Sequence, residues 1–296
     1  MSHRAQATSH NYLLAESNRW WEANPMSYDW HKTIQAPEGT REFFEIIDAR
    51  FFSSSSFYGG DRPFEKLIPF DRLKGARVLE IGCGLGSHAR LLSEAGCCLT
   101  CIDLTDRAVE NTRERLRLSS LPAEIRRMDA EQMDFPDAEF DFVWSWGVIH
   151  HSPDTERIIR HVWRVLKPGG EFRFMVYHRR SISGFYCLTR GLLTGRFFKG
   201  MSTEDVLSHY SDGFLAHFYT RREMRDLLVR CGFSSVETSV LGQKSELIPL
   251  PGNGVSGRLK QILLRALPDA AAERALSVAG FFLFASAGKS SGPPTS

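Results

Sequence analysis

The sequence predicts an α/β fold in which helices cover both faces of a mostly parallel, doubly wound sheet. Short apolar runs alternate with amphipathic helical segments from residue 77 onward, which is typical of parallel strands joined by crossover helices. A glycine-dense turn follows the first of these runs directly, as in a nucleotide-binding unit. The hydrophobic content of 42% with 24% charged residues is ordinary for a chain that buries a large core.

The first strand is predicted at residues 77–81. The turn after it carries three glycines, Gly82, Gly84 and Gly86. Glycines allow backbone angles that other residues avoid, and they leave room for a ligand at the main chain. A helix is expected over 87–94, and a second apolar run over 99–102 ends in Asp103. This order is that of a nucleotide-binding half-site, with the acid placed for ribose hydroxyls.

Five further strands complete the predicted seven-stranded sheet. They are expected at 125–128, 140–145, 171–177, 235–241 and 281–286. The helices between them are expected at 106–118, 154–166 and 222–230. The fourth strand is almost wholly apolar, as a parallel strand buried on both faces should be.

The segments around this core suggest five regions. They are an N-terminal helical arm or lid (1–60), the core (61–178), a helical insertion over the pocket (179–220), the completion of the core with a second insertion (221–288) and a disordered tail (289–296). Within the arm we expect disorder over 1–11 and a helix over 12–23, because the first residues are polar and Pro25 stops a helix.

Composition excludes several classes of protein. The 37 Lys and Arg against 35 Asp and Glu give a net charge of +2, which argues against nucleic acid as a partner. No stretch approaches the roughly 20 apolar residues of a membrane span. The N-terminus lacks an apolar signal-peptide core, so we expect a cytoplasmic location.

Six cysteines include a C-x-x-C pair, Cys98 and Cys101. That spacing occurs in metal sites, but no second pair or histidine pair accompanies it. We interpret these cysteines as small apolar residues of the second strand and expect no metal.

The glycine spacing indicates which nucleotide binds. A dinucleotide fingerprint, G-x-G-x-x-G/A, requires Gly or Ala where this chain has Ser87. Glu80 and the three glycines instead give E-x-G-x-G-x-G, which resembles motif I of the class I S-adenosylmethionine (SAM)-dependent methyltransferases. Three later segments resemble further motifs of that family in the expected order: Asp129-Ala-Glu, Phe140-Asp-Phe-Val and Leu166-Lys-Pro-Gly-Gly.

The resemblance covers residues 75–178 and the two closing strands, and is to the small-molecule, domain 11/25-like members. It implies a Rossmann-like sheet whose last strand is antiparallel, with SAM as cofactor and S-adenosylhomocysteine as product. By position it assigns the cofactor to Glu80, Gly82, Cys83, Gly84, Gly86, Asp103, Leu104, Asp129, Ala130, Ser145 and Trp146. Among these, Asp103 would accept hydrogen bonds from the ribose, and Asp129 would read the adenine edge.

The implied reaction is in-line displacement at the sulfonium methyl, which mainly needs alignment. A general base helps only where the acceptor loses a proton. His150 and His151 follow the fourth strand, at the sheet edge where such folds bind ligands, and are the first candidates. Tyr177, at the end of the fifth strand, is the second. The alternative is that both histidines only hydrogen-bond the loop or cap the next helix.

The acceptor is expected to be a small apolar, aromatic or prenylated compound, because aromatic residues are dense on both sides of the core. The candidates for binding it are Tyr12, Trp20, Trp21, His178, Phe185, Tyr186 and Phe214. O-, N- and C-methylation all stay open. The rival interpretations are a non-catalytic SAM-binding module and an NAD(P)-dependent oxidoreductase. The aromatic arm is also a candidate element for forming a homo-oligomer.

Overall fold

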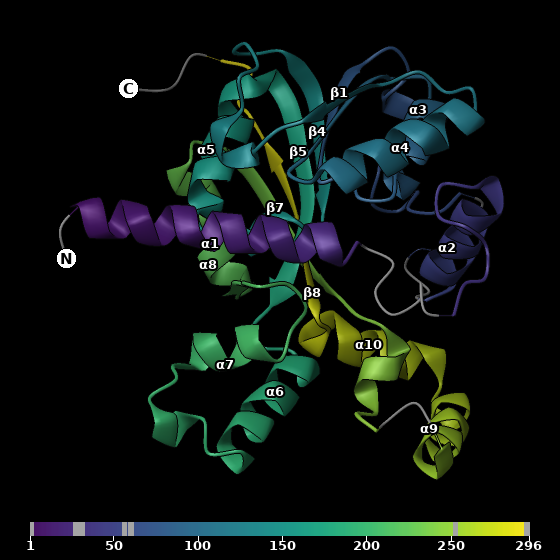
Figure 1. Ribbon diagram of the computed structural model, residues 1–296, viewed down its shortest axis with the longest axis vertical. Coiled ribbons are helices and arrows are strands. Elements are labelled where there is room, and N and C mark those ends of the chain that lie inside the picture. Colours follow the sequence, from purple (N-terminus) through teal and green to yellow (C-terminus); the bar gives the residue numbers. More distant parts are fainter. Residues whose placement is uncertain (1–2, 26–32, 55–57, 59–61, 251–253, 293–296) are drawn as a thin grey trace.

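The computed structural model describes residues 3–25, 33–54, 58, 62–250 and 254–292. Their centre is one sheet with the strand order β3-β2-β1-β4-β5-β8-β7 (Figure 1). Its strands are β1 (Arg77–Ile81), β2 (Cys98–Asp103), β3 (Glu124–Arg127), β4 (Phe140–Trp146), β5 (Leu166–His178), β6 (Phe218–Tyr219), β7 (Ser235–Leu241) and β8 (Phe282–Gly288). The two-residue β6 lies off this path, beside the end of β5.

The sheet confirms the predicted fold class. Neighbouring strands are parallel except β8, which runs antiparallel to both β5 and β7. The strand order reverses at β1: the strands after β1 are added first on one side of it, as β2 and β3, and then on the other, as β4 and β5. In sheets of this kind a crevice opens at the carboxyl ends of the two strands at the reversal, here β1 and β4.

The short strand β6 is an addition that the sequence did not predict. It lies in the segment expected to be helical, and backbone hydrogen bonds hold this segment at the sheet edge. Arg179 N donates to Tyr219 O at 3.0 Å, and His217 N donates to His150 O at 2.8 Å. These long-range bonds extend the sheet beside the loop that follows β4.

Ten α-helices surround the sheet in the described residues. They are α1 (His3–Ala23), α2 (Arg41–Ser53), α3 (Ser87–Glu94), α4 (Asp106–Leu118), α5 (Thr155–Val165), α6 (Ile182–Leu193), α7 (Thr203–His209), α8 (Arg221–Arg230), α9 (Gly254–Ala266) and α10 (Asp269–Ala279). Side chains cap several of the predicted starts, because they satisfy amide donors that the helix leaves free. Thr105, Asp154 and Thr220 accept from the backbone of α4, α5 and α8 respectively.

Two apolar clusters fill the space on the two faces of the sheet. Residues of α5 and α8, such as Ile159 and Met224, pack on one face, while α3 and the segment before β1 pack on the other. Strand β4 contributes side chains to both clusters, because successive side chains of a strand point to opposite faces. Val143 belongs to the first cluster and Trp144 to the second.

The helix α2 is fixed to α4 by a buried ion pair. Arg115 Nη1 lies 2.7 Å from Asp48 Oδ1 and 3.2 Å from Ser87 Oγ, and its side chain is 2% exposed. This network joins the N-terminal region to the helix that follows the glycine turn.

The two ends of the chain differ from expectation. The first helix begins at His3, so disorder over 1–11 is wrong for the described residues, and α1 lies across the sheet in Figure 1. Lys289, placed in the disordered tail, donates its backbone N–H to Gly170 O at 2.9 Å and its Nζ to Leu166 O at 2.7 Å. Residues 293–296 lie outside the described ones.

Candidate active site

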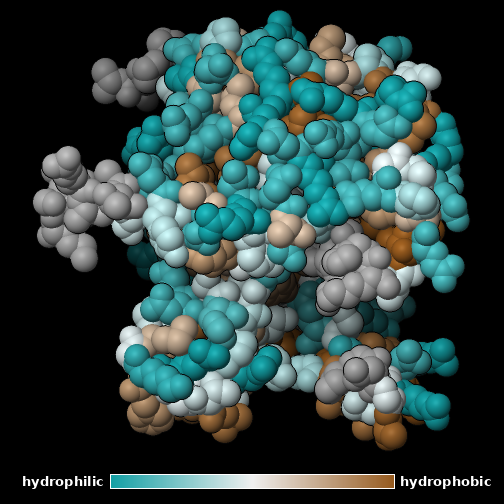
Figure 2. Space-filling model, in the orientation of Figure 1, coloured by the Kyte–Doolittle hydropathy of each residue, from teal (hydrophilic) through white to brown (hydrophobic). Residues whose placement is uncertain are grey.

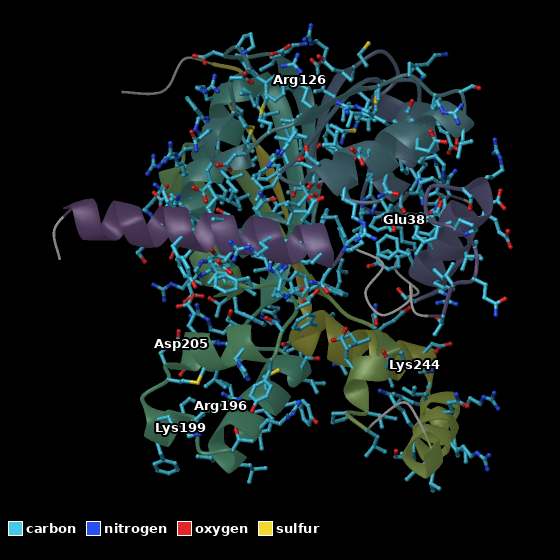
Figure 3. The ribbon with its side chains drawn as sticks, in the orientation of Figure 1. Glu38, Arg126, Arg196, Lys199, Asp205 and Lys244 are labelled. Carbon is cyan, nitrogen blue, oxygen red and sulfur yellow. The ribbon has the colours of Figure 1, made fainter. Side chains whose placement is uncertain are left out.

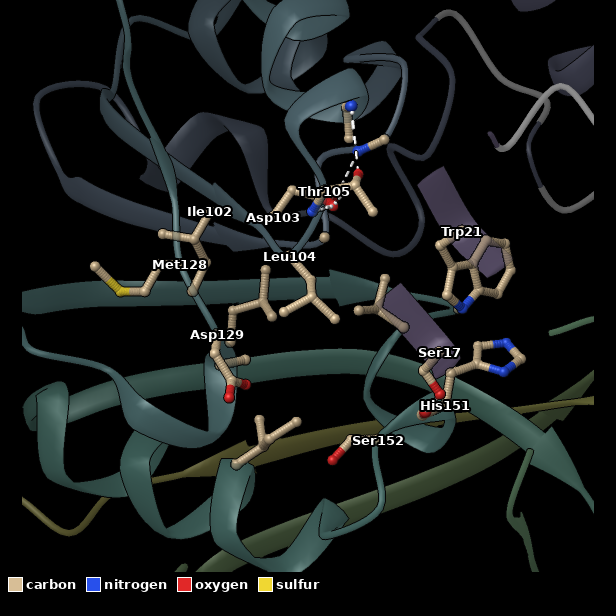
Figure 4. Close-up of a pocket in the computed structure, with 18 of the residues that line it drawn as sticks. Ser17, Trp21, Ile102, Asp103, Leu104, Thr105, Met128, Asp129, His151 and Ser152 are labelled. Carbon is tan, nitrogen blue, oxygen red and sulfur yellow. Dashed lines mark hydrogen bonds between the residues drawn. The ribbon is translucent and has the colours of Figure 1, made fainter. Parts of the chain in front are cut away.

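A cavity of about 900 Å³, counted with its open mouth, lies at the carboxyl ends of β1, β2 and β4 (Figure 4). Its lining includes Gly82 and Gly84 of the glycine turn, Asp103 after β2, and Asp129 after β3. We call it the nucleotide cavity.

The glycine turn must be free of side chains to form this cavity wall. Gly82 has φ +79°, and a Cβ there would lie 2.2 Å from Val148 Cγ2. Gly86 is left-handed and stands at the N-terminus of α3. Residues with side chains rarely adopt such angles, so the predicted glycine pattern is required by the backbone.

Asp103 is held in place by the surrounding backbone. Gly84 N donates to its Oδ2 at 3.1 Å, while Thr105 N and Thr105 Oγ1 donate to its Oδ1 at 3.0 and 2.9 Å. Burial raises the pKa of Asp103, and these hydrogen bonds oppose that rise. A carboxylate has about four acceptor positions, and these three bonds leave one, on Oδ2, for a ribose hydroxyl.

Apolar side chains form the far end of the nucleotide cavity. Leu104, Met128 and Ala130 line it beside Asp129. The Asp129 carboxylate accepts from Glu131 N at 2.9 Å, which fixes the turn after β3. Apolar walls with one carboxylate at the edge suit a purine ring.

A smaller space of about 410 Å³ adjoins the other side of the glycine turn, where Cys83, His88 and Trp146 line it. Glu80 does not line it but is buried nearby, with Oε1 3.8 Å from His88 Nδ1. Burial raises the pKa of Glu80 to about 8 and lowers the pKa of His88 to about 3. Both groups are therefore neutral near pH 7 in the ligand-free protein.

Ser145 lines neither the nucleotide cavity nor this smaller space. It is fully buried, and its Oγ donates to Ile81 O at 3.1 Å, which ties β4 to β1. The position of Ser145 at the end of the fourth strand suggested a role at the cofactor. Its hydroxyl instead donates a hydrogen bond to the backbone of the neighbouring strand β1.

A second cavity, of about 790 Å³ with its mouth, adjoins the first. Its walls are mainly aromatic: Phe51, Tyr58, Trp146, Tyr177 and Phe282. Its polar side chains include Asp212 and Gln243, and Tyr177 Oη donates to Asp212 Oδ1. We call this second space the acceptor cavity, after the role proposed for it below. Trp21 and Gly147 line both it and the nucleotide cavity. The two spaces therefore share a wall.

The two candidate histidines occupy different environments. His151 lines the nucleotide cavity, where its Nδ1 lies 2.7 Å from Leu215 O. His150 is fully buried, lines none of the three cavities and packs on Tyr177 with ring centroids 4.0 Å apart. Burial lowers the pKa of both histidines. The structure therefore keeps His151 and Tyr177 as candidates at a cavity and places His150 behind them.

Most aromatic residues assigned to the acceptor lie elsewhere. Phe185 is 73% exposed and Tyr186 44% exposed on α6. His178 is buried, with Nδ1 3.1 Å from Gly280 O. Tyr12 and Phe214 contact each other edge to face. None of these five lines any of the three cavities described above.

The helix α1 covers the nucleotide cavity. Trp21 packs edge-on against His151 with centroids 4.8 Å apart, and Trp20 packs on Trp21. Ser17 Oγ reaches His151 O at 3.5 Å, and His10 Nε2 lies 2.7 Å from Glu131 Oε2. Figure 4 shows Ser17 and Trp21 beside His151 at the cavity.

Four residues that line the acceptor cavity were not predicted from the sequence: Asp212, Gln243, Phe51 and Tyr58. Asp212 lies in the loop after α7, and Gln243 follows β7. Only the tertiary contacts bring these two to one cavity, and no local pattern marks them. Among the described residues there is no cluster of three or more His, Cys, Asp or Glu side chains suited to a metal. No described helix is long and apolar enough to cross a membrane.

Comparison with known proteins supports the interpretation of the core. Residues 79–174 match the family model "Methyltransferase domain". The chain is 32% identical to the sarcosine/dimethylglycine N-methyltransferase of Halorhodospira halochloris over 163 residues, 47% of this chain and 58% of the relative. It is 35% identical to the S-adenosyl-L-methionine-dependent Diels-Alderase iccD of Talaromyces variabilis over 39% of this chain and 41% of the relative. The chain thus spans about half the length of these relatives.

A solved structure shows the same fold. Phosphoethanolamine N-methyltransferase 2 of Haemonchus contortus, in complex with phosphomonomethylethanolamine and S-adenosylhomocysteine, superposes with a TM-score of 0.53 at 18% identity, over 83% of this chain and 57% of that one. The motif order, the reversal of the sheet at β1 and the glycine turn agree with these matches. Residues 79–174 therefore form a methyltransferase domain of the class I, SAM-dependent type.

Proposed function

We propose that this protein transfers a methyl group from SAM to a small-molecule acceptor held in the aromatic acceptor cavity. The observation that carries the proposal is the wall shared by the two cavities, at Trp21 and Gly147. A cofactor on one side and an acceptor on the other would meet there. In-line displacement requires such alignment above all, because the sulfonium already activates its methyl group.

We expect the cofactor to lie in the nucleotide cavity in one direction. Asp103 would accept a hydrogen bond from a ribose hydroxyl, and Leu104 and Met128 would pack against the adenine. The methionine part would then run along Gly82 and Gly84 toward the smaller space beside Trp146. This direction places the sulfonium near Trp146, which also lines the acceptor cavity.

The acceptor cavity favours a compound with a large apolar or aromatic body. Its aromatic rings supply that surface, so aromatic and prenylated compounds suit it. The Tyr177–Asp212 pair would supply a polar group that accepts a proton from the acceptor or hydrogen-bonds its O–H or N–H group. This pair supports O- or N-methylation over methylation of an alkene carbon.

Two other functions use the same architecture. A SAM-binding module would bind the cofactor without turnover, and one relative is named a Diels-Alderase. An oxidoreductase would need a nicotinamide dinucleotide instead. The position of Ser87 argues against that cofactor, because the pyrophosphate turn requires Gly or Ala there.

Calorimetric titration of SAM, S-adenosylhomocysteine and NADPH into the purified protein tests the cofactor. We expect micromolar binding of the first two and none of NADPH. A screen of aromatic and prenylated hydroxyl and amine compounds with methyl-labelled SAM then tests transfer. Binding of SAM without label transfer to any of them would favour the non-catalytic module, and binding of NADPH alone would overturn the proposal.

A further inference from the structure

Exposed apolar side chains gather on two lobes at one end of the molecule. One lobe contains α6 and the turn after it, and the other contains α9 (Figure 1). The exposed residues are Phe185, Leu192, Leu193 and Phe198 on the first, and Val255, Leu259, Ile262 and Leu263 on the second. Figure 2 shows hydrophobic surface at the lower ends of both lobes.

The apolar residues of α9 form one stripe. Val255, Leu259, Ile262 and Leu263 are spaced i, i+4, i+7 and i+8, which places them on one face of a helix. A buried stripe of this kind normally explains why a helix stays folded on its protein. Here Val255 is 86% exposed and Ile262 63% exposed, and among the residues of α9 only Gly257 is buried. The stripe faces outward.

The first lobe repeats this arrangement. Gly184 and Gly191 form the buried side of α6, because a Cβ at Gly191 would lie 2.4 Å from Val206 Cγ1. The opposite side carries the large apolar residues: Leu193 is 80% exposed, and Phe198 just beyond the helix is 86% exposed. Single exposed apolar residues are ordinary, but two outward stripes at one end mark an interaction surface.

The charges of the two segments have one sign. Residues 182–200 contain three basic side chains, and residues 254–266 contain three more. These are Arg190, Arg196, Lys199, Arg258, Lys260 and Arg265, and neither segment contains Asp or Glu. The nearest acids along the chain already have partners. Beside the first segment, Asp205 accepts from Ser202 and Glu204 pairs with His217. Beside the second, Asp269 pairs with Lys244. Figure 3 shows Arg196 and Lys199 on the same lobe.

We propose that this end of the molecule binds the surface of an anionic lipid membrane. Apolar side chains beside basic ones, without acids, are typical of helices that lie in the headgroup region of a bilayer. The apolar stripes of α6 and α9 would enter the interface. The long Arg and Lys side chains would reach the phosphates.

Binding in this orientation has a consequence for the acceptor. Asp212 follows α7, which packs against α6 of the first lobe. Gln243 stands before the segment that leads into the second lobe. Both line the acceptor cavity, so both lobes connect to its wall. An acceptor carried in a membrane would then enter between the lobes; this consequence rests on the proposed function, whereas membrane binding does not.

The test is co-sedimentation of the full chain with vesicles, without SAM or acceptor. Vesicles of phosphatidylcholine alone are compared with vesicles that also contain phosphatidylglycerol. We expect binding to the anionic vesicles and a loss of it at high salt. Vesicle binding should weaken at least about tenfold in each of two double variants. These are Leu193→Glu with Phe198→Glu, and Val255→Glu with Ile262→Glu. Arg258→Gln with Arg265→Gln should weaken vesicle binding by about fivefold per charge removed.

The matched control is Val229→Glu on α8. Val229 is 57% exposed but lies outside both lobes, so this variant should bind like the wild type. Melting curves and SAM titration confirm that each variant is folded. Equal binding by the lobe variants and the wild type would overturn the proposal, as would no binding to anionic vesicles. The protein could instead self-associate without binding vesicles. If Val255→Glu with Ile262→Glu abolished that self-association, the surface would bind a second copy of the chain and the membrane proposal would be overturned.

Discussion

The backbone N–H of Gly84 donates to Asp103 Oδ2 at 3.1 Å. This bond joins the glycine turn after β1 to the acid after β2, so the two parts of the proposed cofactor site hold each other in place. Because Thr105 occupies the other carboxylate oxygen, Asp103 is aligned in the ligand-free protein. A site aligned in advance loses less entropy on binding.

Asp103→Asn should weaken SAM binding by about 10- to 100-fold, which corresponds to roughly 1–3 kcal/mol. The amide keeps the size of the side chain but replaces one acceptor oxygen with an NH2 donor, which would face the N–H of Gly84 or of Thr105. Calorimetry measures the change. Asp106→Asn, on the exposed first turn of α4, is the control and should bind SAM as the wild type does. Unchanged affinity in Asp103→Asn would exclude Asp103 as the ribose acceptor.

Gly82→Ala should disrupt the nucleotide cavity, because its Cβ would meet Val148 Cγ2 at 2.2 Å. Gly75→Ala is the matched control: its φ of +73° is similar, but no atom lies within 4 Å of the new Cβ. Both variants should lose about 1–2 kcal/mol from the left-handed backbone. Only Gly82→Ala should lose more, together with SAM binding. Denaturant melts and titrations that give the same result for both would contradict this account.

Glu80 should make the ligand-free protein less stable as the pH rises. Its pKa rises from the ordinary 4.5 to about 8 on folding. Between these values the unfolded chain releases the proton and the folded chain keeps it, so the folded state binds more protons and its stability falls with pH. In Glu80→Gln this decline should be absent.

Melting temperatures of the wild type and Glu80→Gln, measured from pH 5 to pH 8, check this effect. The curves should diverge as the pH rises, with the variant becoming the more stable relative to the wild type. His88 and Asp103 titrate in both proteins, so their contributions largely cancel in the difference. Parallel curves would show that Glu80 is ionised in the folded protein.

Trp21→Ala should shorten the residence time of SAM. The indole lies on α1, packs on His151 and lines both cavities, so its removal opens the cover. We expect the dissociation rate of SAM, followed by stopped-flow fluorescence, to rise by about tenfold or more. Arg19→Ala is the control on the same helix, because the Arg19 side chain is 72% exposed. A rate equal to that of the control would exclude α1 as a lid.

Asp212→Asn should lower kcat by at least about tenfold while SAM affinity changes less than twofold, once an acceptor is found. The carboxylate contacts Tyr177 in the acceptor cavity and does not line the nucleotide cavity. Tyr177→Phe should cost a similar factor, and the double variant little more, because residues that act as a unit are not additive. Additive losses would indicate that the two side chains act separately.

The sequence by itself determined the architecture of the core. Alternating strand and helix patterns predicted a doubly wound, mostly parallel sheet, and the E-x-G-x-G-x-G sequence predicted a glycine turn after its first strand. These predictions succeed because they rest on local chemistry: the φ angles of the glycine turn, helix caps such as Thr105, and apolar runs act within a few residues.

Only the tertiary structure determines which residues line the acceptor cavity. Phe185 and Tyr186 were predicted at the acceptor, yet they lie on the exposed side of α6, because Gly184 and Gly191 turn the other side of that helix inward. Asp212 and Gln243 meet at one cavity from segments far apart in the chain. Burial direction and long-range contact depend on how whole elements pack, and the composition of one segment does not encode them.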